Sequence, residues 1–162
     1  MEVLNLINNG SNLLKYHKVT SHILDSEILL SKVLNTSREE LLINLGKKIP
    51  IDKVKRFQEL IERRAKKEPI AYILKHKEFW GKNFKVNKNT LVPRPETELM
   101  VEKIVRIFNK KKIKILDIGT GTGCILLSLL AELKNSSGIG IDISSKAISI
   151  AKKNKEIVKI DN

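Results

Sequence analysis

A glycine-rich run flanked by two acidic residues contains the residue types in this 162-residue chain that could support chemistry. Gly119, Gly121 and Gly123 alternate with threonines, Asp117 lies just before them, and Asp142 follows further along the chain. Glycines let the backbone turn sharply and let a ligand approach the main chain without meeting a Cβ atom. An acidic residue at the end of the next strand can accept hydrogen bonds from ribose hydroxyls. The pattern therefore predicts a site for a nucleoside-containing cofactor.

Several kinds of loop share this glycine spacing. A dinucleotide fingerprint requires Gly-x-Gly-x-x-Gly or Ala, but Cys124 occupies its last place here. A Walker loop is excluded because no Gly-Lys-Ser or Gly-Lys-Thr follows. A bare Gly-x-Gly-x-Gly can also be a plain strand-to-helix turn. The run from Asp117 to Gly123 resembles the Asp-x-Gly-x-Gly-x-Gly loop of class-I methyltransferases, so we expect S-adenosyl-L-methionine as the cofactor.

The elements around this loop alternate between strand and helix. Residues 113–118 predict a strand, 125–133 a mostly apolar helix, and 139–143 a second strand. Ser144 is a suitable N-cap for a helix that runs through Lys153. Residues 157–160 suggest the start of a third strand. This order favours a parallel, doubly wound sheet, with Asp142 at the carboxyl end of the second strand.

The first seventy or so residues predict a bundle of short amphipathic helices. Apolar residues recur at helical spacing in two stripes, between residues 4 and 14 and between residues 23 and 34. Ser37 and Glu40 have the spacing of a capping box, which starts a third helix. A further helix should run from Asp52 to Lys67 and stop before Pro69. Nothing in this region has a catalytic pattern.

Between the bundle and the glycine loop, the pattern becomes extended. Residues 78–86 alternate around a turn at 81–83, which suits a β-hairpin. Two prolines in 92–98 force an extended entry to a helix that carries Leu99 and Ile107. We therefore predict an α/β protein with a helical domain at 1–75, a hairpin linker at 76–95, and an incomplete Rossmann-like domain at 96–162.

The net charge of +13 is large for this length. Such a field attracts acidic proteins, nucleic acids or anionic membranes. However, only six of the 31 basic residues are arginine, and the lysines are scattered among many isoleucines and asparagines, as a compositional bias of the genome would produce. A dedicated nucleic-acid surface usually clusters its basic residues and adds aromatic side chains or arginine. The charge alone favours no partner.

The remaining reactive residue types point to no second site. Cys124 is the single cysteine, which excludes an internal disulfide and a cysteine-based zinc cluster, and we interpret it as a small helix residue. His17, His22 and His76 show no metal-ligand spacing, so we expect no metal site. No apolar run approaches the length needed to cross a bilayer. We expect a cytoplasmic monomer with no membrane contact and no specific nucleic-acid partner.

Three stretches together resemble the HemK/PrmC family of release factor glutamine methyltransferases. They are Glu68–Leu74 with Glu78–Gly81, then Leu91–Glu98 with its Pro-Arg-Pro-Glu-Thr-Glu run, and Ile115–Ile125. The resemblance extends over essentially the whole chain. It implies methylation of the side-chain nitrogen of the glutamine in the Gly-Gly-Gln motif of peptide chain release factors, with the helical domain as the part that binds the release factor.

The resemblance also implies roles for individual residues. The loop residues would cradle the methionine part of the cofactor: Gly119, Thr120, Gly121, Thr122 and Gly123. Asp142 would hold the ribose, Asp117 would lie near the methionine amine, and Thr97 would reach the cofactor from the upstream segment. A plain hydroxyl at a helix N-terminus is an equally open interpretation of Thr97. Phe79 and Trp80 are assigned to packing between hairpin and domain.

One family element is missing from these residues. The Asn-Pro-Pro-Tyr segment, whose acceptors aim the weakly nucleophilic amide nitrogen, does not occur in the sequence. We therefore assign no catalytic residue and expect a methyltransferase truncated before that segment, inactive by itself. One alternative is a non-catalytic module that docks release factors or another acidic partner. Nucleic-acid methylation is a third possibility, but the Pro-Arg-Pro-Glu-Thr-Glu stretch and the helical domain point away from it.

Overall fold

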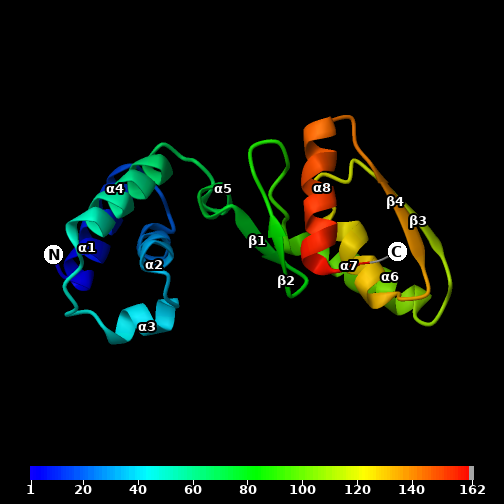
Figure 1. Cartoon of the computed structure of the whole chain (residues 1–162), viewed down its shortest axis with the longest axis horizontal. Helices are drawn as coiled ribbons and strands as arrows, with labels where there is room; N and C mark the ends of the chain where they lie inside the picture. Colours follow the sequence, from blue (N-terminus) through cyan, green and yellow to red (C-terminus); the bar gives the residue numbers. More distant parts are fainter. Residues whose placement is uncertain (161–162) are drawn as a thin grey trace. The chain divides into compact units, whose positions relative to one another are not determined.

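The computed structural model describes residues 1–160 and divides the chain into two compact units (Figure 1). The first unit comprises Met1–Leu74 and the second begins at Lys75. Each is described by itself below. Within residues 1–160, no helix combines the length and hydrophobicity that a membrane span requires.

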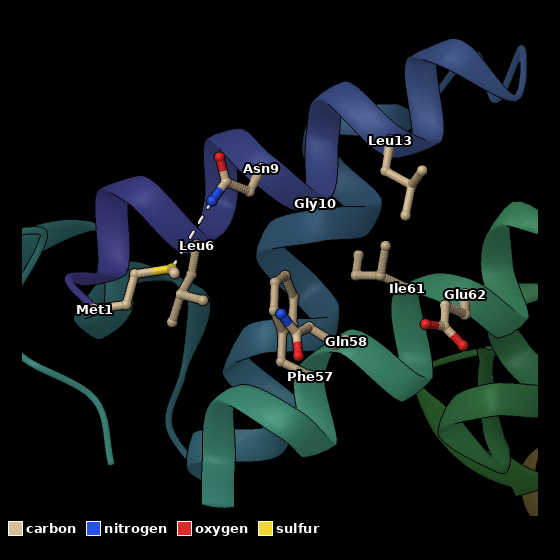
Figure 2. A pocket seen from close by; sticks show the side chains of 9 residues that line it. All are labelled: Met1, Leu6, Asn9, Gly10, Leu13, Phe57, Gln58, Ile61 and Glu62. Atoms are coloured by element: carbon tan, nitrogen blue, oxygen red, sulfur yellow. Dashed lines mark hydrogen bonds between the residues drawn. The ribbon is translucent and has the colours of Figure 1, made fainter. Parts of the chain in front are cut away.

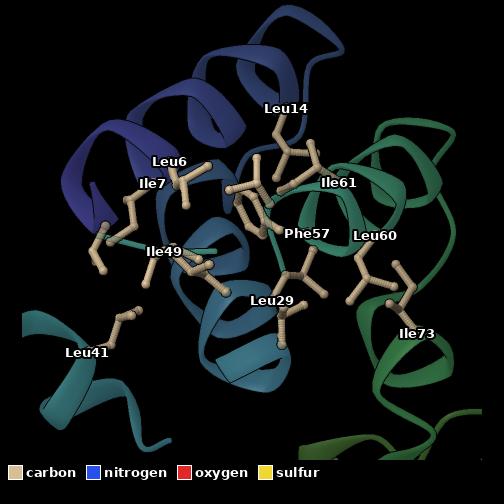
Figure 3. Packing of buried hydrophobic residues seen from close by; sticks show 14 of the residues in the cluster. Leu6, Ile7, Leu14, Leu29, Leu41, Ile49, Phe57, Leu60, Ile61 and Ile73 are labelled. Carbon is tan, nitrogen blue, oxygen red and sulfur yellow. The ribbon is translucent and has the colours of Figure 1, made fainter. Parts of the chain in front are cut away.

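The first unit is entirely helical apart from a single bridge between Glu2 and Lys48. Its elements are α1 (Val3–Tyr16), α2 (His22–Leu34), α3 (Arg38–Ile43), α4 (Ile51–Ala65) and α5 (Ile70–Leu74). Figure 3 shows that the apolar faces of α1, α2 and α4 meet in one core, where Leu14, Leu29 and Phe57 are buried. The predicted helical bundle is therefore present.

A glycine lets the three main helices of this core approach closely. A Cβ atom on Gly10 of α1 would lie 2.6 Å from Ser26 Oγ, 2.8 Å from Phe57 Cζ and 3.0 Å from Ile61 Cδ1. Ser26 comes from α2, and Phe57 and Ile61 come from α4. Since ordinary side-chain contacts are longer, α1 can pack here only because residue 10 has no side chain.

Three local predictions in this unit can be compared with the structure. Ser37 caps α3 by accepting from Glu40 N at 3.1 Å, as predicted, but the Glu40 carboxylate accepts from the Thr36 hydroxyl in place of completing the capping box. The long helix α4 ends at Ala65, close to the predicted stop. The short helix α5 lies where Pro69 suggested an extended segment; proline is tolerated just before a helix.

The second unit begins with a hairpin of β1 (His76–Phe79) and β2 (Lys82–Lys85). This hairpin confirms the prediction, but its turn lies at Trp80 and Gly81, not at residues 81–83. The φ angles of Trp80 and Gly81 are both positive, at 51° and 63°. A two-residue turn between twisted strands requires such angles. A tryptophan rarely adopts this backbone conformation, which is why the sequence pattern misplaced the turn.

The remainder of the second unit has the order of a Rossmann-like methyltransferase start. A 3₁₀ turn, η1 (Pro95–Thr97), leads into α6 (Glu98–Phe108), followed by β3 (Lys114–Ile118), α7 (Cys124–Glu132), β4 (Ser137–Ile141) and α8 (Ser145–Val158). The two strands are parallel, with Leu116 opposite Ile139. The predicted α/β class is confirmed. Residues 157–160 are not a strand, because α8 continues to Val158 and ends at Lys159 in the left-handed conformation.

The two faces of the β3–β4 pair differ. Helix α7 contacts both strands on one face. On the other face, Leu116, Ile118, Ile139 and Ile141 are 60%, 76%, 66% and 45% exposed. In the part of the chain that the structure describes, this second face of the sheet is therefore apolar and uncovered.

Candidate functional site

The glycine loop joins the carboxyl end of β3 to the start of α7. The backbone amides of Gly119 and Thr120 both donate to Ile141 O at 2.9 Å, so the loop is anchored to the end of β4. Gly119, Gly121 and Gly123 have φ values of 78°, 55° and 78°. Only glycine adopts these values without strain, which explains the alternate spacing.

The loop leaves open space where a ligand could approach it. A Cβ atom on Gly119 would meet nothing within 4 Å, and one on Gly121 would meet only Gly119 O at 3.9 Å. A Cβ atom on Gly123 would instead press on Leu127 at 3.1 Å and Ala151 at 3.3 Å. Gly119 and Gly121 therefore form the open side of the loop, and Gly123 packs it against α7 and α8.

The two acidic residues lie beside the loop, Asp117 within β3 and Asp142 directly after β4. Thr120 Oγ donates to Asp117 Oδ2 at 2.7 Å. Asp142 Oδ2 accepts from Gly121 N and its Oδ1 accepts from Ser144 N, both at 2.9 Å. A carboxylate offers about four acceptor positions. Both side chains therefore retain capacity for ligand hydroxyl or ammonium groups.

The backbone contacts of Asp142 also keep it ionised. Hydrogen bonds from Ser144 N and then Gly121 N lower the pKa of its carboxyl group below the ordinary value of 3.8. Donors that stabilise the charged form act in this direction. Asp142 is therefore a carboxylate at neutral pH and can accept two hydrogen bonds from adjacent hydroxyls.

Most loop amides are occupied within the protein. Besides those of Gly119, Thr120 and Gly121, Gly123 N donates to Thr120 O at 2.7 Å and Cys124 N donates to Thr122 Oγ at 3.3 Å. A pyrophosphate-binding loop needs free amides directed at the phosphate. The ionised Asp142 and the acidic Asp117 would also repel an anion. The arrangement therefore fits a cationic or neutral ligand with hydroxyl groups better than a dinucleotide.

Two glycines of β4 support the loop, and the sequence pattern did not single them out. A Cβ atom on Gly140 would lie 2.8 Å from Thr120 Oγ, and one on Gly138 would lie 2.5 Å from Leu126 Cδ1. Their positions next to the loop and α7 allow this close packing. Their spacing of two in a predicted strand was a possible signal, because a glycine in a strand often marks a close approach.

Thr97, which was predicted to reach the cofactor, forms a hydrogen bond only three residues back along the chain. Thr97 N donates to Arg94 O at 3.1 Å within η1. The neighbouring Glu98 has a more distant partner, because its Oε1 accepts from Trp80 N at 2.9 Å. The upstream segment is thereby tied to the hairpin turn, and Trp80 Nε1 donates to Glu132 at 3.0 Å. Phe79 is buried against Phe84 and Val101.

Cys124 and the histidines provide no further chemistry. Cys124 is buried at the start of α7, and burial raises the pKa of its thiol. His22 Nδ1 lies 2.8 Å from Ser11 Oγ in the first unit. Among residues 1–160, no group of three or more His, Cys, Asp or Glu side chains is placed to hold a metal ion.

The helical unit contains a separate cavity of about 330 Å³ between α1 and α4. Figure 2 shows its lining side chains, with Phe57 and Ile61 projecting from α4 toward the backbone of α1 at Gly10. Leu13 and Met1 lie at its partly exposed margins, while Asn9, Gln58 and Glu62 add polar groups. The lining of this cavity is therefore a mixture of apolar and polar side chains.

Comparisons with known proteins match both units. Residues 5–74 match the family described as PrmC N-terminal domain, and residues 109–162 match a methyltransferase domain family. A release factor glutamine methyltransferase from Buchnera aphidicola subsp. Baizongia pistaciae (strain Bp) is 42% identical over 164 residues. That alignment covers 100% of this chain and 58% of the relative.

Two further relatives give the same result. A release factor glutamine methyltransferase from Fusobacterium nucleatum subsp. nucleatum is 37% identical over 163 residues, covering 99% of this chain and 46% of the relative. A bifunctional methyltransferase from Rickettsia typhi is 38% identical over 168 residues, covering 92% of this chain and 32% of the relative. The chain thus spans between about a third and three fifths of these relatives. The resemblance predicted from the sequence is confirmed, because the chain matches the N-terminal part of relatives named release factor glutamine methyltransferase.

Proposed function

We propose that this chain is the cofactor-binding and substrate-docking part of a release factor glutamine N5-methyltransferase. The methyltransferase match implies a methyl donor, and we infer that it is S-adenosyl-L-methionine. The observation that carries the proposal is the glycine loop between β3 and α7, with Asp117 and Asp142 beside it. The loop is open at Gly119 and Gly121, and most of its amides, which an anion would need, already donate to other groups of the protein. These properties fit a ligand with a ribose and a cationic methionine.

The chain's own residues have distinct parts in this proposal. Asp142 accepts the ribose hydroxyls, Asp117 faces the methionine ammonium, and Gly119 and Gly121 let the cofactor lie against the backbone. When bound, S-adenosylmethionine supplies an electrophilic methyl group on its sulfonium sulfur. Thr97 remains a proposed contact from the upstream segment, since its described hydrogen bond is to Arg94 O and no bond among residues 1–160 joins it to the loop.

For the protein substrate, we infer the glutamine of the Gly-Gly-Gln motif of release factors, as the names of the relatives suggest. The helical unit would supply the docking surface, with the cavity between α1 and α4 as its contact (Figure 2). The alternative that the helical unit docks an acidic partner through its positive charge has little support, because that charge is small in this unit. Residues 1–74 contain thirteen basic and nine acidic residues, whereas residues 75–162 contain eighteen and nine.

Calorimetry with S-adenosylmethionine tests the cofactor site. We expect binding by the chain and a roughly ten- to hundred-fold loss in the Asp142→Asn variant, because charge-assisted hydrogen bonds to the ribose disappear. Glu156→Gln removes the same charge from an exposed position on α8 and should leave binding unchanged. Equal affinity in the wild type and Asp142→Asn would contradict the assignment of the ribose contact.

Two assays with a release factor test the remainder. Because the 162 residues contain no Asn-Pro-Pro-Tyr segment, incubating them with labelled S-adenosylmethionine should leave the glutamine unmodified. Turnover well above background would refute the need for that segment.

Binding of the release factor should weaken in Leu13→Glu at the cavity margin but not in Ile43→Glu, which is equally apolar and lies outside the cavity. A chain that binds release factor and not the cofactor would support the non-catalytic alternative.

A further inference from the structure

Asn154 is a buried amide on α8 with three backbone partners from distant parts of the chain. Its side chain is 0% exposed. Lys85 N donates to Asn154 Oδ1 at 2.7 Å, and Asn154 Nδ2 donates to Lys85 O at 3.0 Å and to Thr122 O at 2.8 Å. Both amide protons and the amide oxygen are therefore in use.

On one side, Asn154 acts in place of a neighbouring strand. In the hairpin register, Lys85 lies opposite His76, and Val86 N donates to Lys75 O at 3.2 Å. Since hydrogen-bonded and non-hydrogen-bonded pairs alternate in an antiparallel ladder, the N–H and C=O of Lys85 point away from β1. The Asn154 amide pairs with both groups, as the backbone of a third strand would.

On its other side, Asn154 holds the cofactor loop. Thr122 lies between Gly121 and Gly123, two of the three loop glycines that have positive φ values. Fixing the carbonyl of Thr122 fixes the peptide plane that it shares with Gly123. The preceding glycine, Gly121, is held by Asp142 through the 2.9 Å bond from its amide. The loop is therefore secured at consecutive residues by two side chains from different elements.

We propose that Asn154 is a positioning residue that couples the hairpin to the cofactor loop and keeps the loop in its ligand-accepting conformation. The inference rests on the proposed function for its ligand, S-adenosylmethionine. Asn154 does not touch the open side of Gly119 and Gly121. It acts through Thr122, and removing it should loosen the loop without removing any ligand contact.

The Asn154→Asp variant tests this coupling with almost no change in side-chain volume. Its carboxylate can still accept from Lys85 N, but it cannot donate to Thr122 O or Lys85 O and would place negative charge against both carbonyls. By calorimetry, we expect the dissociation constant for S-adenosylmethionine to rise at least about ten-fold. By hydrogen exchange on the ligand-free chain, the amides of Gly121 and Gly123 should exchange faster than in the wild type.

A merely structural role predicts a different exchange pattern. If Asn154 only stabilised the unit, exchange would accelerate equally in the loop and in β4, for example at the amide of Ile139. The Ser128→Ala variant serves as a matched control, because Ser128 is also 0% exposed and lies on the neighbouring helix α7 without a hydrogen bond to the loop. That variant should keep the wild-type affinity and should not accelerate exchange of the loop amides.

Lys85→Pro gives a second route to the same answer if Asn154→Asp does not fold. It removes the outward N–H that donates to Asn154, and it leaves α8 unchanged, because proline is tolerated where a strand's N–H does not join the ladder. The loop amides should again exchange faster. Unchanged loop exchange in a folded variant, or acceleration that is equal in β4, would overturn the proposal. If the wild type fails to bind S-adenosylmethionine, the proposed cofactor is wrong, while loop exchange still decides the role of Asn154.

Discussion

The backbone amide of Gly121 donates to Asp142 Oδ2 at 2.9 Å and joins the end of β4 to the turn that follows β3. The residue assigned to the ribose thus also holds the backbone against which the methionine part would lie. Substituting it should affect both the ligand contact and the order of the loop. Experiments on Asp142 therefore need a readout in the absence of ligand as well as an affinity.

Asp142 should titrate at a lower pH than an ordinary aspartate. Hydrogen bonds from Ser144 N and Gly121 N lower its pKa below 3.8. A lowered pKa in the folded state means that the charged form contributes stability above the unfolded-state pKa, and this contribution is lost as pH falls through the folded-state pKa. The NMR shift of the Gly121 amide should stay constant from about pH 8 to about pH 5. It should then titrate with a midpoint below 3.8.

The Asp142→Asn variant provides the control for this titration. In that variant, the Gly121 amide should lose the acidic transition while resonances from outside the glycine loop are retained. A wild-type midpoint above 3.8 would contradict the bonding described for this carboxylate.

Gly10→Ala should destabilise the helical unit by about 1–2 kcal/mol, because overpacking a core costs more than the better helix propensity of alanine contributes. The new Cβ atom would lie 2.6 Å from Ser26 Oγ and 2.8 Å from Phe57 Cζ, and both distances are overlaps. Urea denaturation followed by circular dichroism measures the change. Gly46→Ala is the matched comparison, because its Cβ atom meets nothing within 4 Å and should be tolerated. Equal stability of the two variants would show that α1 can move away at no cost.

Ser128→Ala should stabilise the second unit by about 1 kcal/mol, because a buried hydroxyl without a partner costs free energy and alanine is the better helix former. The Ser128 hydroxyl has no hydrogen-bond partner among the described residues. Ser26→Ala offers a comparison at another fully buried serine, whose Oγ donates to Ile7 O at 2.8 Å. That variant should lose stability. Urea denaturation that shows a loss in both variants would mean that Ser128 has a partner in solution.

Cys124 should be unreactive in the native chain. Burial raises the pKa of its thiol, so less thiolate is present in mildly alkaline buffer, and the surrounding side chains block a reagent. Reaction with a chromogenic disulfide should be slow in buffer and fast in urea. Because the chain has a single cysteine, the signal reports this site alone. Rapid reaction under native conditions would indicate that the start of α7 opens readily.

Local patterns predicted the elements but not all of their ends. The glycine spacing, the cap at Ser144 and the prolines before α6 each depend on neighbouring residues, and Ser144 does accept from Ala147 N at 3.2 Å. The turn at Trp80 was missed because a positive φ at tryptophan is favoured only by contacts formed on folding, among them the bond from its amide to Glu98. The expected strand at 157–160 was wrong because an apolar run that short fits either structure.

The residues of the candidate site also fall into two groups, those that local patterns predict and those that only long-range packing brings together. The proximity of Asp117, Asp142 and the loop glycines could be predicted because strands, turn and helix bring them together through short connections, and their role in cofactor binding stays a prediction. Asn154 could not, since its partners Lys85 and Thr122 lie 69 and 32 residues away in sequence. An asparagine in an amphipathic helix resembles any surface polar residue until its neighbours are known. Residues that act through long-range packing therefore need coordinates to be recognised.

The amide of Asn154 also has a consequence for how this protein avoids self-association. An exposed strand edge invites another chain to pair with it, and natural sheets usually block such edges with charge, proline or a covering element. In the hairpin, the Asn154 side chain is hydrogen-bonded to both the N–H and the C=O of Lys85, so the backbone of another chain cannot pair with Lys85. A single buried asparagine thus closes the outer edge of β2 against aggregation at this residue.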